Sequence, residues 1–430
     1  MRTVQYNQLN ETLYYEELPN GLQVYILPKQ GFSKTYATFT TKYGSIDNEF
    51  TQPGKERLHV PDGIAHFLEH KMFEQKEGDV FAEFSAHGAS ANAFTSFDRT
   101  AYLFSSTQDV PHNVETLLNF VQDPHFTDEN VEKEKGIIGQ EIRMYDDDAD
   151  WRVYFGLIAN FYHHHPIKID IAGTVESISA ITKDLLYECY NTFYHPSNML
   201  LFIVGAVNPD EMIELVRRNQ AAKPYEKQAE IPRFYPEEPT SVAQERSIVH
   251  LPVGVPKCMF GFKDKETGLT GEALLKREVA TEIVMDVLFS PSSALYQQLY
   301  DEGLITDSFG ADYSGEVAYG FSLIGGDTKD PDALVSTVRA ELVNIVAKGI
   351  DAESFELSRK KKTGEFLRSL NSVEFIANSF TKYKFGGTDL FRRADVLEAI
   401  TLADVNERLR EHIDFDQLSV SIVKSPETKQ

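Results

Sequence analysis

The sequence has little cysteine, little basic charge and no long apolar run, and each shortage excludes a class of protein. Its 430 residues include only two cysteines, Cys189 and Cys258, which are too few for the disulfide framework of a secreted domain. Neither lies in a CxxC pair or in a cluster of cysteine and histidine. We interpret both as ordinary thiols of a reducing compartment, and we expect the protein in the cytoplasm.

Long apolar segments are missing as well. The longest, Met199 to Val207, is far shorter than the roughly 20 apolar residues that a transmembrane helix requires. The stretch from Met1 to Gly21 has no apolar core of the kind that marks a secretory signal peptide. We therefore expect neither a membrane-spanning segment nor a signal peptide.

Basic residues are outnumbered, with 42 Lys and Arg against 66 Asp and Glu and a formal net charge of −24. Nucleic acids and anionic membranes are both bound through clustered basic side chains, because these attract phosphate groups. We therefore expect no nucleic-acid partner and no membrane partner. The simplest interpretation of the acidic surplus is solubility.

The rest of the composition, with 42% hydrophobic and 25% charged residues, is typical of a globular protein of two or three domains. Strand patterns such as the alternating Thr35 to Tyr43 occur among amphipathic helical patterns such as Val114 to Phe120. This mixture predicts domains that contain both helices and sheets.

The two halves of the chain share a pattern. Glu129 to Glu141 and Glu353 to Glu365 have the same length, and they lie 224 positions apart. A chance match of two amphipathic helices is the alternative, but we prefer an internal duplication. The proline-rich segment 223–246 has no hydrophobic period and predicts a linker. We thus expect two similar domains, at 1–222 and 247–430.

One short string carries chemistry, because His66 and His70 enclose Glu69 in HFLEH. On a helix these three side chains share a face. A catalytic zinc site needs three protein ligands and a carboxylate that takes a proton from water. The string supplies two ligands and the base, and HxxEH is a known signature of zinc peptidases. The alternative, a helix with two surface histidines, is disfavoured by the apolar neighbours of the string.

A third ligand is expected from another element. The pattern of a helix from Asp128 to Tyr145 offers three carboxylates, those of Glu132, Glu134 and Glu141. Glu134 and Glu141 share a face, and Ile137 and Ile138 lie between them, so we expect that face to pack inward. Buried carboxylates need a positive partner, which a zinc ion provides. A solvated acidic helix is the alternative.

Several strings follow one another in the first half: LPNGLQVYILP, GIAHFLEHKMF, GASANAFTSFDRTAYLF and VEKEKGIIGQEI. Their order and spacing resemble the zinc peptidases of the insulinase, pitrilysin and mitochondrial processing peptidase group. The second half matches weakly, through SPSSALYQQLYDEGL. The resemblance implies an α+β fold of two similar αβ domains, each a mostly antiparallel sheet covered by helices. Together the two domains would form half of a clamshell.

The resemblance also implies roles for single residues. His66, His70 and Glu141 would hold a Zn²⁺ ion. Glu69 would be the general base, and Glu134 would be a carboxylate behind the ligands that supports the site.

A substrate site is implied in the same way. The resemblance makes Ala91 to Thr95 an edge strand beside the zinc, to which an extended peptide substrate would add as a further strand. Asn92, Ala93 and Phe94 are then the substrate-binding candidates. The run His163 to His165 matches the family as a structural feature. The other histidines, with His87 and His112 among them, are isolated in the sequence.

One departure from the family concerns an Arg and a Tyr that catalytic members take from the other half of the clamshell. Here Ala294, Tyr300 and Thr306 occupy the corresponding string, and Tyr313 nearby has no Arg at the right spacing. The resemblance therefore implies a hetero-dimer with a zinc-less paralogue that carries the Arg/Tyr pair. A homodimer is the alternative.

Together these features predict a zinc-dependent endopeptidase or oligopeptidase subunit that hydrolyses peptides through an activated water. Two alternatives stay open, a non-catalytic structural or assembly subunit of the same family and a dedicated maturation factor for one peptide. The intact HxxEH string, together with Glu141, argues against the non-catalytic subunit.

Overall fold

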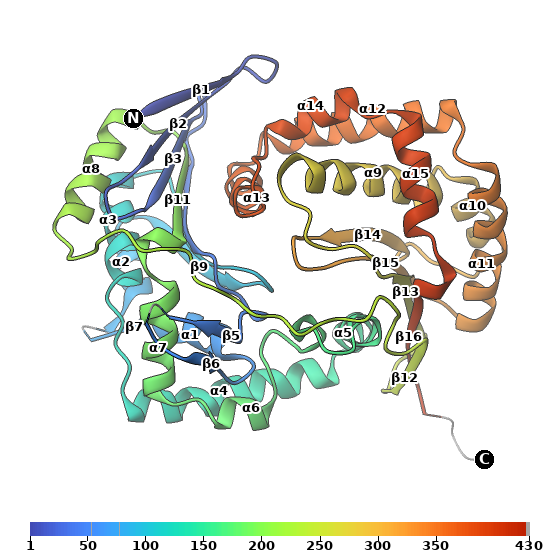
Figure 1. Ribbon diagram of the computed structural model, residues 1–430, viewed down its shortest axis with the longest axis horizontal. Coiled ribbons are helices and arrows are strands. Elements are labelled where there is room, and N and C mark those ends of the chain that lie inside the picture. Colours follow the sequence, from blue (N-terminus) through green and yellow to red (C-terminus); the bar gives the residue numbers. More distant parts are fainter. Residues whose placement is uncertain (53, 77, 427–430) are drawn as a thin grey trace. The chain divides into compact units, whose positions relative to one another are not determined.

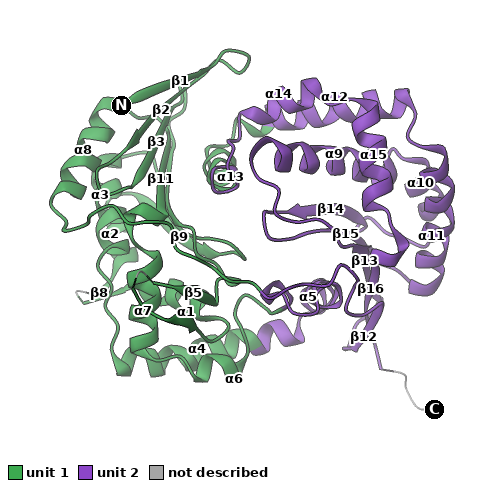
Figure 2. Ribbon diagram, viewed as in Figure 1, with its two compact units in different colours: residues 1–142, 169–235, 369–382 green, residues 143–168, 236–368, 383–430 purple. Residues whose placement is uncertain are grey.

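The computed structural model describes residues 1–52, 54–76 and 78–426 of the chain (Figure 1). These residues form two compact units, and each unit is assembled from separate stretches of the sequence (Figure 2). Unit 1 comprises Met1–Ile142, Ile169–Tyr235 and Ser369–Lys382. Unit 2 comprises Arg143–Lys168, Pro236–Arg368 and the described chain from Tyr383 onward.

Unit 1 contains a seven-stranded sheet in the order β1-β2-β3-β11-β4-β10-β9. Strands β3 and β11 run parallel, and the other neighbouring pairs are antiparallel. β-branched, aromatic and other apolar residues fill β4 and β11, and every residue of these two central strands is buried. The strands are β1 (Arg2–Tyr6), β2 (Glu11–Glu17), β3 (Gln23–Pro28), β4 (Thr35–Thr41), β9 (Ala89–Thr95), β10 (Thr100–Ser106) and β11 (Met199–Gly205).

Unit 2 repeats this arrangement with a five-stranded sheet in the order β12-β16-β13-β15-β14. Here β12 and β16 are parallel, and the remaining pairs are antiparallel. Strand for strand, the order and the directions match β3-β11-β4-β10-β9 of unit 1, which confirms two similar αβ units with mostly antiparallel sheets. The strands are β12 (Arg246–His250), β13 (Lys257–Phe262), β14 (Gly310–Gly315), β15 (Gly320–Asp327) and β16 (Leu418–Lys424).

Helices cover the sheets. In the first half they are α1 (Ile64–Met72), α2 (Val80–Ala86), α3 (Val110–Val121), α4 (Asp128–Asp147), α5 (Ala149–Phe161), α6 (Val175–Ser179), α7 (Lys183–Phe193) and α8 (Pro209–Ala221). In the second half they are α9 (Gly271–Phe289), α10 (Ala294–Asp301), α11 (Pro331–Lys348), α12 (Ala352–Ser369), α13 (Val373–Phe385), α14 (Arg392–Ala399) and α15 (Leu402–His412). None of the helices in the described ranges is both long and apolar enough to cross a bilayer.

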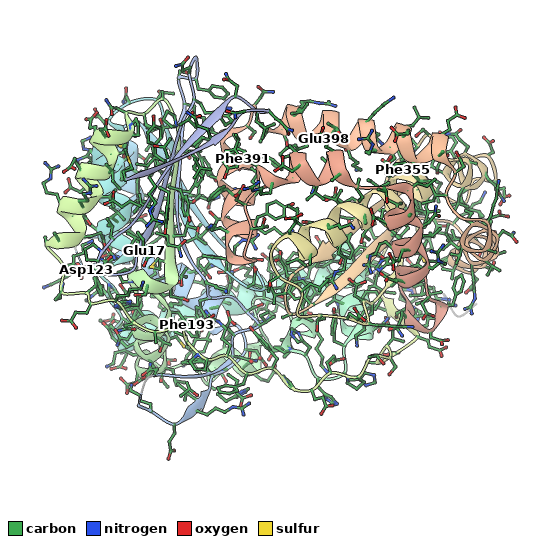
Figure 3. The ribbon with its side chains drawn as sticks, turned by 45° about the horizontal axis from the view of Figure 1, so that its top comes forward. Glu17, Asp123, Phe193, Phe355, Phe391 and Glu398 are labelled. Atoms are coloured by element: carbon green, nitrogen blue, oxygen red, sulfur yellow. The ribbon has the colours of Figure 1, made fainter. Side chains whose placement is uncertain are left out.

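Short elements complete the fold. They are the hairpins β5 (Glu49–Thr51) with β6 (Arg57–His59) and β7 (Glu74–Gln75) with β8 (Gly78–Asp79), and the 3-10 turns η1 (Pro166–Lys168), η2 (Pro196–Asn198) and η3 (Phe415–Gln417). Phe193, labelled in Figure 3, ends α7 in the core of unit 1, where its ring stacks on Tyr43 with 4.0 Å between centroids.

Each sheet is covered in part by a helix from the other half of the sequence. α5 belongs to unit 2, where Phe161 packs on Phe321 of β15 with 5.8 Å between ring centroids. α13 lies mostly in unit 1, where Phe380 packs on Tyr25 of β3 at 4.9 Å and on Phe202 of β11 at 4.7 Å. The two compact units are therefore interleaved in the sequence. The expected contiguous domains, 1–222 and 247–430, stay a prediction.

We predict that Phe380→Ala destabilises the protein by about 3–5 kcal/mol, the range for removing a large buried aromatic side chain. Its ring is fully buried against Tyr25 and Phe202, so truncation leaves a cavity on the sheet of unit 1. The measurement is the urea midpoint of unfolding. Leu357→Ala is the control, because Leu357 is 65% exposed and should change the midpoint little. Equal shifts in both variants would contradict the packing role of α13.

Candidate metal centre

The residues of HFLEH lie on α1, whose start is fixed by a glycine. Gly63, immediately before the helix, has a φ of 85°. A Cβ at this position would lie 2.4 Å from the carbonyl oxygen of Ala172, so glycine is required. The apolar residues of α1 are buried, which orients the helix. His66, Glu69 and His70 are consequently half-buried on its remaining face.

Helix α4 places a carboxylate opposite both histidines. Oε1 of Glu141 is 3.7 Å from Nε2 of His66, and Oε2 of Glu141 is 3.6 Å from Nε2 of His70. These separations are too long for hydrogen bonds. They resemble the roughly 3.4 Å between ligand atoms that surround a tetrahedral ion at about 2.0–2.2 Å. Two imidazole nitrogens and a carboxylate, all within 4.8 Å of one another, are a donor set that suits zinc.

The facing sides of α1 and α4 carry surplus negative charge. Burial lowers the pKa of His66 to about 4, with a further contribution from His70, so its imidazole is neutral and keeps a nitrogen lone pair for a metal. The pKa of His70 is raised: burial opposes the rise, but a hydrogen bond to Glu134 and the charges of Glu69 and Glu141 outweigh it. The negative charge of the carboxylates around His70 therefore attracts a cation.

Glu134 supports the site from behind His70. Its Oε1 is 3.1 Å from Nδ1 of His70, and its Oε2 is 3.4 Å from Nζ of the fully buried Lys71. Burial alone would raise the pKa of Glu134, but the contacts with His70 and Lys71 lower it, and the carboxylate stays ionised. An ionised Glu134 accepts the Nδ1–H of His70, which leaves Nε2 of that ring available opposite Glu141.

Lys71 has no role in the sequence-based expectations. Its ammonium group also pairs with Glu74, so it neutralises charge at two carboxylates inside unit 1. The signal that could have found it is its position directly after HFLEH, because Glu134 on the inward face of α4 requires a buried cation nearby.

The structure separates the three carboxylates that the α4 pattern offers. Glu134 and Glu141 face α1, whereas Glu132 is exposed and pairs with Lys135. The expectation that Ile137 and Ile138 both pack inward is wrong for one of them. Ile138 is fully buried, but Ile137 is 46% exposed, because one residue along a helix turns the side chain by about 100°.

Glu69 is held by the neighbouring strand. Oγ1 of Thr95, the last residue of β9, donates a hydrogen bond of 2.9 Å to Oε2 of Glu69. Burial raises the pKa of Glu69, and the charge of His70 and the bond from Thr95 only partly oppose the rise. A raised pKa makes the carboxylate a stronger proton acceptor.

β9 is an edge strand of the sheet of unit 1. It pairs with β10 on one side, and no described strand pairs with it on the other. Asn92 is exposed, Ala93 and Phe94 are half-buried, and Oδ1 of Asn92 accepts the backbone N–H of Ala93 at 2.9 Å. Through Thr95, this edge is connected directly to Glu69.

The tyrosines considered for the Arg/Tyr pair have different environments in unit 2. Tyr313 is buried, and its hydroxyl donates a hydrogen bond of 2.6 Å to Asp264, which also contacts Arg408 and His412. Tyr300 is 50% exposed near the end of α10. The hydroxyl of Tyr313 is thus held in a buried ionic network. Of these two tyrosines, only Tyr300 exposes its side chain to solvent.

The histidine run acts through its backbone. The N–H groups of His163, His164 and His165 donate to the carboxylate of Glu238 at 2.8–2.9 Å, and Lys263 pairs with the same group at 2.8 Å. Burial would raise the pKa of Glu238, but these donors lower it to about 2. The run is a nest for a carboxylate, which agrees with the structural interpretation. His87 and His112, which are isolated in the sequence, stack their rings in the structure.

Two family models match the chain. The model described as Insulinase (Peptidase family M16) covers residues 60–175, and the model described as Peptidase M16 inactive domain covers residues 180–362. The chain belongs to the insulinase family, M16. It is 57% identical over 421 residues to the "Uncharacterized zinc protease YmfH" of Bacillus subtilis (strain 168), with 98% of each chain covered.

Two further M16 comparisons cover different shares of the chain. A crystal structure described as an M16-like peptidase from Alicyclobacillus acidocaldarius superimposes with a TM-score of 0.94 at 45% identity, over 98% of this chain and 100% of that one. The mitochondrial-processing peptidase subunit beta of Bos taurus is 29% identical over 180 residues, which are 41% of this chain and 37% of that protein. The chain thus belongs to a family in which relatives are named zinc proteases.

We predict that Glu238→Gln destabilises unit 2 by about 1–3 kcal/mol at neutral pH, because the buried Lys263 loses its ionised partner. The folded pKa of about 2 lies below the unfolded value of about 4.3, so Glu238 contributes stability above the unfolded pKa. The difference from wild type should therefore shrink as the pH falls from about 5 toward 2.

Urea midpoints at pH 7, 5 and 3 measure this difference. Glu237→Gln is the matched control, because Glu237 is the exposed neighbour and should leave the midpoint unchanged at each pH. A difference that stays constant down to pH 3 would show that the charge of Glu238 does not matter.

Proposed function

We propose that this chain is the zinc-bearing subunit of a peptidase and that His66, His70 and Glu141 hold the zinc ion. The observation that carries the proposal is the convergence of their Nε2 and carboxylate atoms at 3.6–3.7 Å, from two helices that bury their other faces. When bound, zinc supplies a Lewis acid that acidifies water and polarises a peptide carbonyl.

Glu69 is the general base in this proposal. Water adds to the carbonyl carbon of the scissile peptide bond, Glu69 takes the proton that the water loses, and it delivers this proton to the departing amine as the C–N bond breaks. Thr95 holds the carboxylate in place through its hydroxyl. Glu134 holds His70 in the tautomer that leaves Nε2 available, and Lys71 keeps Glu134 ionised.

The substrate is an extended peptide that adds to β9. The backbone at Asn92, Ala93 and Phe94 lies at the free edge of the sheet, and the Oδ1 of Asn92 that accepts the N–H of Ala93 would have to move aside. Main-chain pairing recognises the backbone and not the side chains, so it supports activity on many sequences. Because β9 ends at Thr95, a peptide on this edge leads toward Glu69.

The working enzyme is a dimer in this proposal, and the partner is a zinc-less paralogue that carries the Arg/Tyr pair. The environments of Tyr313 and Tyr300 support it, since the first is bound to Asp264 in the core and the second has no arginine beside it in the string. A homodimer that uses Tyr300 is the alternative. Both cysteine thiols are free and buried, which supports a reducing location such as the cytoplasm.

We expect Glu69→Gln to keep its zinc and to lower kcat/KM for peptide cleavage by about 10²–10⁴-fold, because Glu69 moves a proton but is not a ligand. Glu141→Gln should instead lower the zinc content together with the activity. Metal analysis and peptide cleavage measure the two properties. Glu132→Gln, on the exposed face of α4, is the control and should change neither. Turnover retained by Glu69→Gln would overturn the role of the base.

We also expect the purified chain alone to be a weak peptidase. Adding a zinc-less M16 paralogue that carries Arg and Tyr should raise kcat/KM by about 10²–10³-fold, the range for donors that stabilise charge in the transition state. Activity measured against partner concentration tests this, with an Arg→Ala variant of the partner as the control. Full activity of the chain alone, abolished by Tyr300→Phe, would instead establish the homodimer. No activity in any mixture would favour a non-catalytic subunit.

A further inference from the structure

A second group of potential metal ligands lies in unit 1, separate from α1 and α4. Glu83 and His87 are on α2 and just after its end, four positions apart, and His112 is in the first turn of α3. Nε2 of His112 is 2.8 Å from Oε1 of Glu83, and Nε2 of His87 is 3.6 Å from the same oxygen. One ligand atom from each residue lies within 4.8 Å of the others.

A fourth residue orients one of these ligands. Nδ1 of His87 lies 3.2 Å from a carboxylate oxygen of Asp109, so the Nδ1–H can donate to Asp109 and leave the Nε2 lone pair on the side of Glu83. A carboxylate behind a histidine is the usual support of a metal-binding imidazole. The backbone of Asp109 is left-handed, with a φ of 47°, a conformation shared with only one other non-glycine residue in the described ranges.

The two imidazole rings face each other. Their centroids are 3.7 Å apart and their planes are inclined by 29°. Two protonated rings at this distance repel each other, whereas one cation bound to both nitrogens and to Glu83 replaces that repulsion with attraction. Neutral imidazole is the form that binds metals.

The surroundings are acidic. A cavity of about 970 Å³ borders the group and is lined by Glu83 and His112 themselves. Further acidic lining residues are Asp79, Glu115 and Asp123, of which Asp123 is labelled in Figure 3. Among the described lining residues, the only basic side chain besides His112 is Lys223. The ammonium group of Lys223 donates hydrogen bonds to the carbonyl oxygen of Leu118 and to Oε1 of Gln122. The surplus of negative charge in this lining concentrates cations next to Glu83, His87 and His112.

We propose that Glu83, His87 and His112 form a second metal site, for a borderline transition-metal cation such as Zn²⁺, oriented by Asp109. Two imidazoles and one carboxylate favour Zn²⁺, Ni²⁺ and Cu²⁺ over Mg²⁺ and Ca²⁺, which prefer oxygen ligands. The side chains are 33–51% exposed, so the site is open and binds more weakly than the half-buried group on α1.

Occupancy of this site has a structural consequence. The ion joins the end of α2 to the first turn of α3, the two helices that flank the β9–β10 hairpin in the sequence. His87 is only two residues before Ala89, where the edge strand β9 begins. The metal thus fixes the start of the strand whose other end contacts Glu69 through Thr95.

Equilibrium dialysis of the untagged full chain against Zn²⁺ tests the site. Wild type should bind two equivalents, and either His112→Ala or Glu83→Gln should remove the weaker one only. His66→Ala should remove the tighter equivalent only. His59→Ala, which replaces an exposed histidine of β6, is the control and should retain both. A second equivalent that survives in both His112→Ala and Glu83→Gln would overturn the proposal, as would a wild type whose single equivalent is lost in His66→Ala.

A second measurement is independent of the proposed catalytic zinc. In the His66→Ala background, saturating Zn²⁺ should raise the unfolding temperature by about 3–8 °C, because a ligand that binds only the folded state stabilises it. Adding His112→Ala should abolish this rise, and adding His59→Ala should not. A rise that persists with His112→Ala would place the ion elsewhere. If only the His66-dependent equivalent is missing in wild type, the proposed function fails while this site stands.

Discussion

The pairing of Glu134 with His70 and Lys71 is the constraint on which the arrangement of α1 and α4 depends. A carboxylate in a protein interior is tolerated only when cations and hydrogen-bond donors surround it, and here both come from consecutive residues of one helix. Because His70 and Lys71 point toward Glu134, Glu141, about two turns further along α4, lies opposite His66 and His70. One ionic contact behind the proposed ligands thus helps to set the distances between His66, His70 and Glu141.

Unit 2 shows the same helix pair with its charges neutralised internally. α12 corresponds to α4 in the repeated order, and it carries two lysines, Lys361 and Lys362, that lie close to α9. These lysines pair with Asp286 of α9, at 2.6 Å for Lys361. Acid and base are therefore matched within unit 2 at this pair of helices. The two units thus share a fold but differ in how the charges of this helix pair are matched.

Helical periodicity was enough to predict from the sequence that His66, Glu69 and His70 share a face and that Glu134 and Glu141 share another, because both are local relations. It could not assign Glu134 and Glu141 to different roles, since that depends on which of them reaches His70 from behind. The strand patterns and the duplication predicted the αβ class. The sequence could not predict that α5 packs in unit 2 and α13 mostly in unit 1, because the pattern of a helix does not specify which sheet it covers. His112 likewise meets His87 only after the β9–β10 hairpin has folded.

The exchanged helices also bear on how the protein is made. A ribosome adds residues from the N-terminus, so Tyr25 and Phe202 are synthesised long before Phe380, which covers them. All seven strands of the sheet of unit 1 precede residue 206, but the segment that covers Tyr25 and Phe202 begins only at Ser369. A gene fragment that stops in the proline-rich segment would leave that apolar surface open to other nascent chains. The order of synthesis therefore places the helix that covers the sheet of unit 1 after most of unit 2.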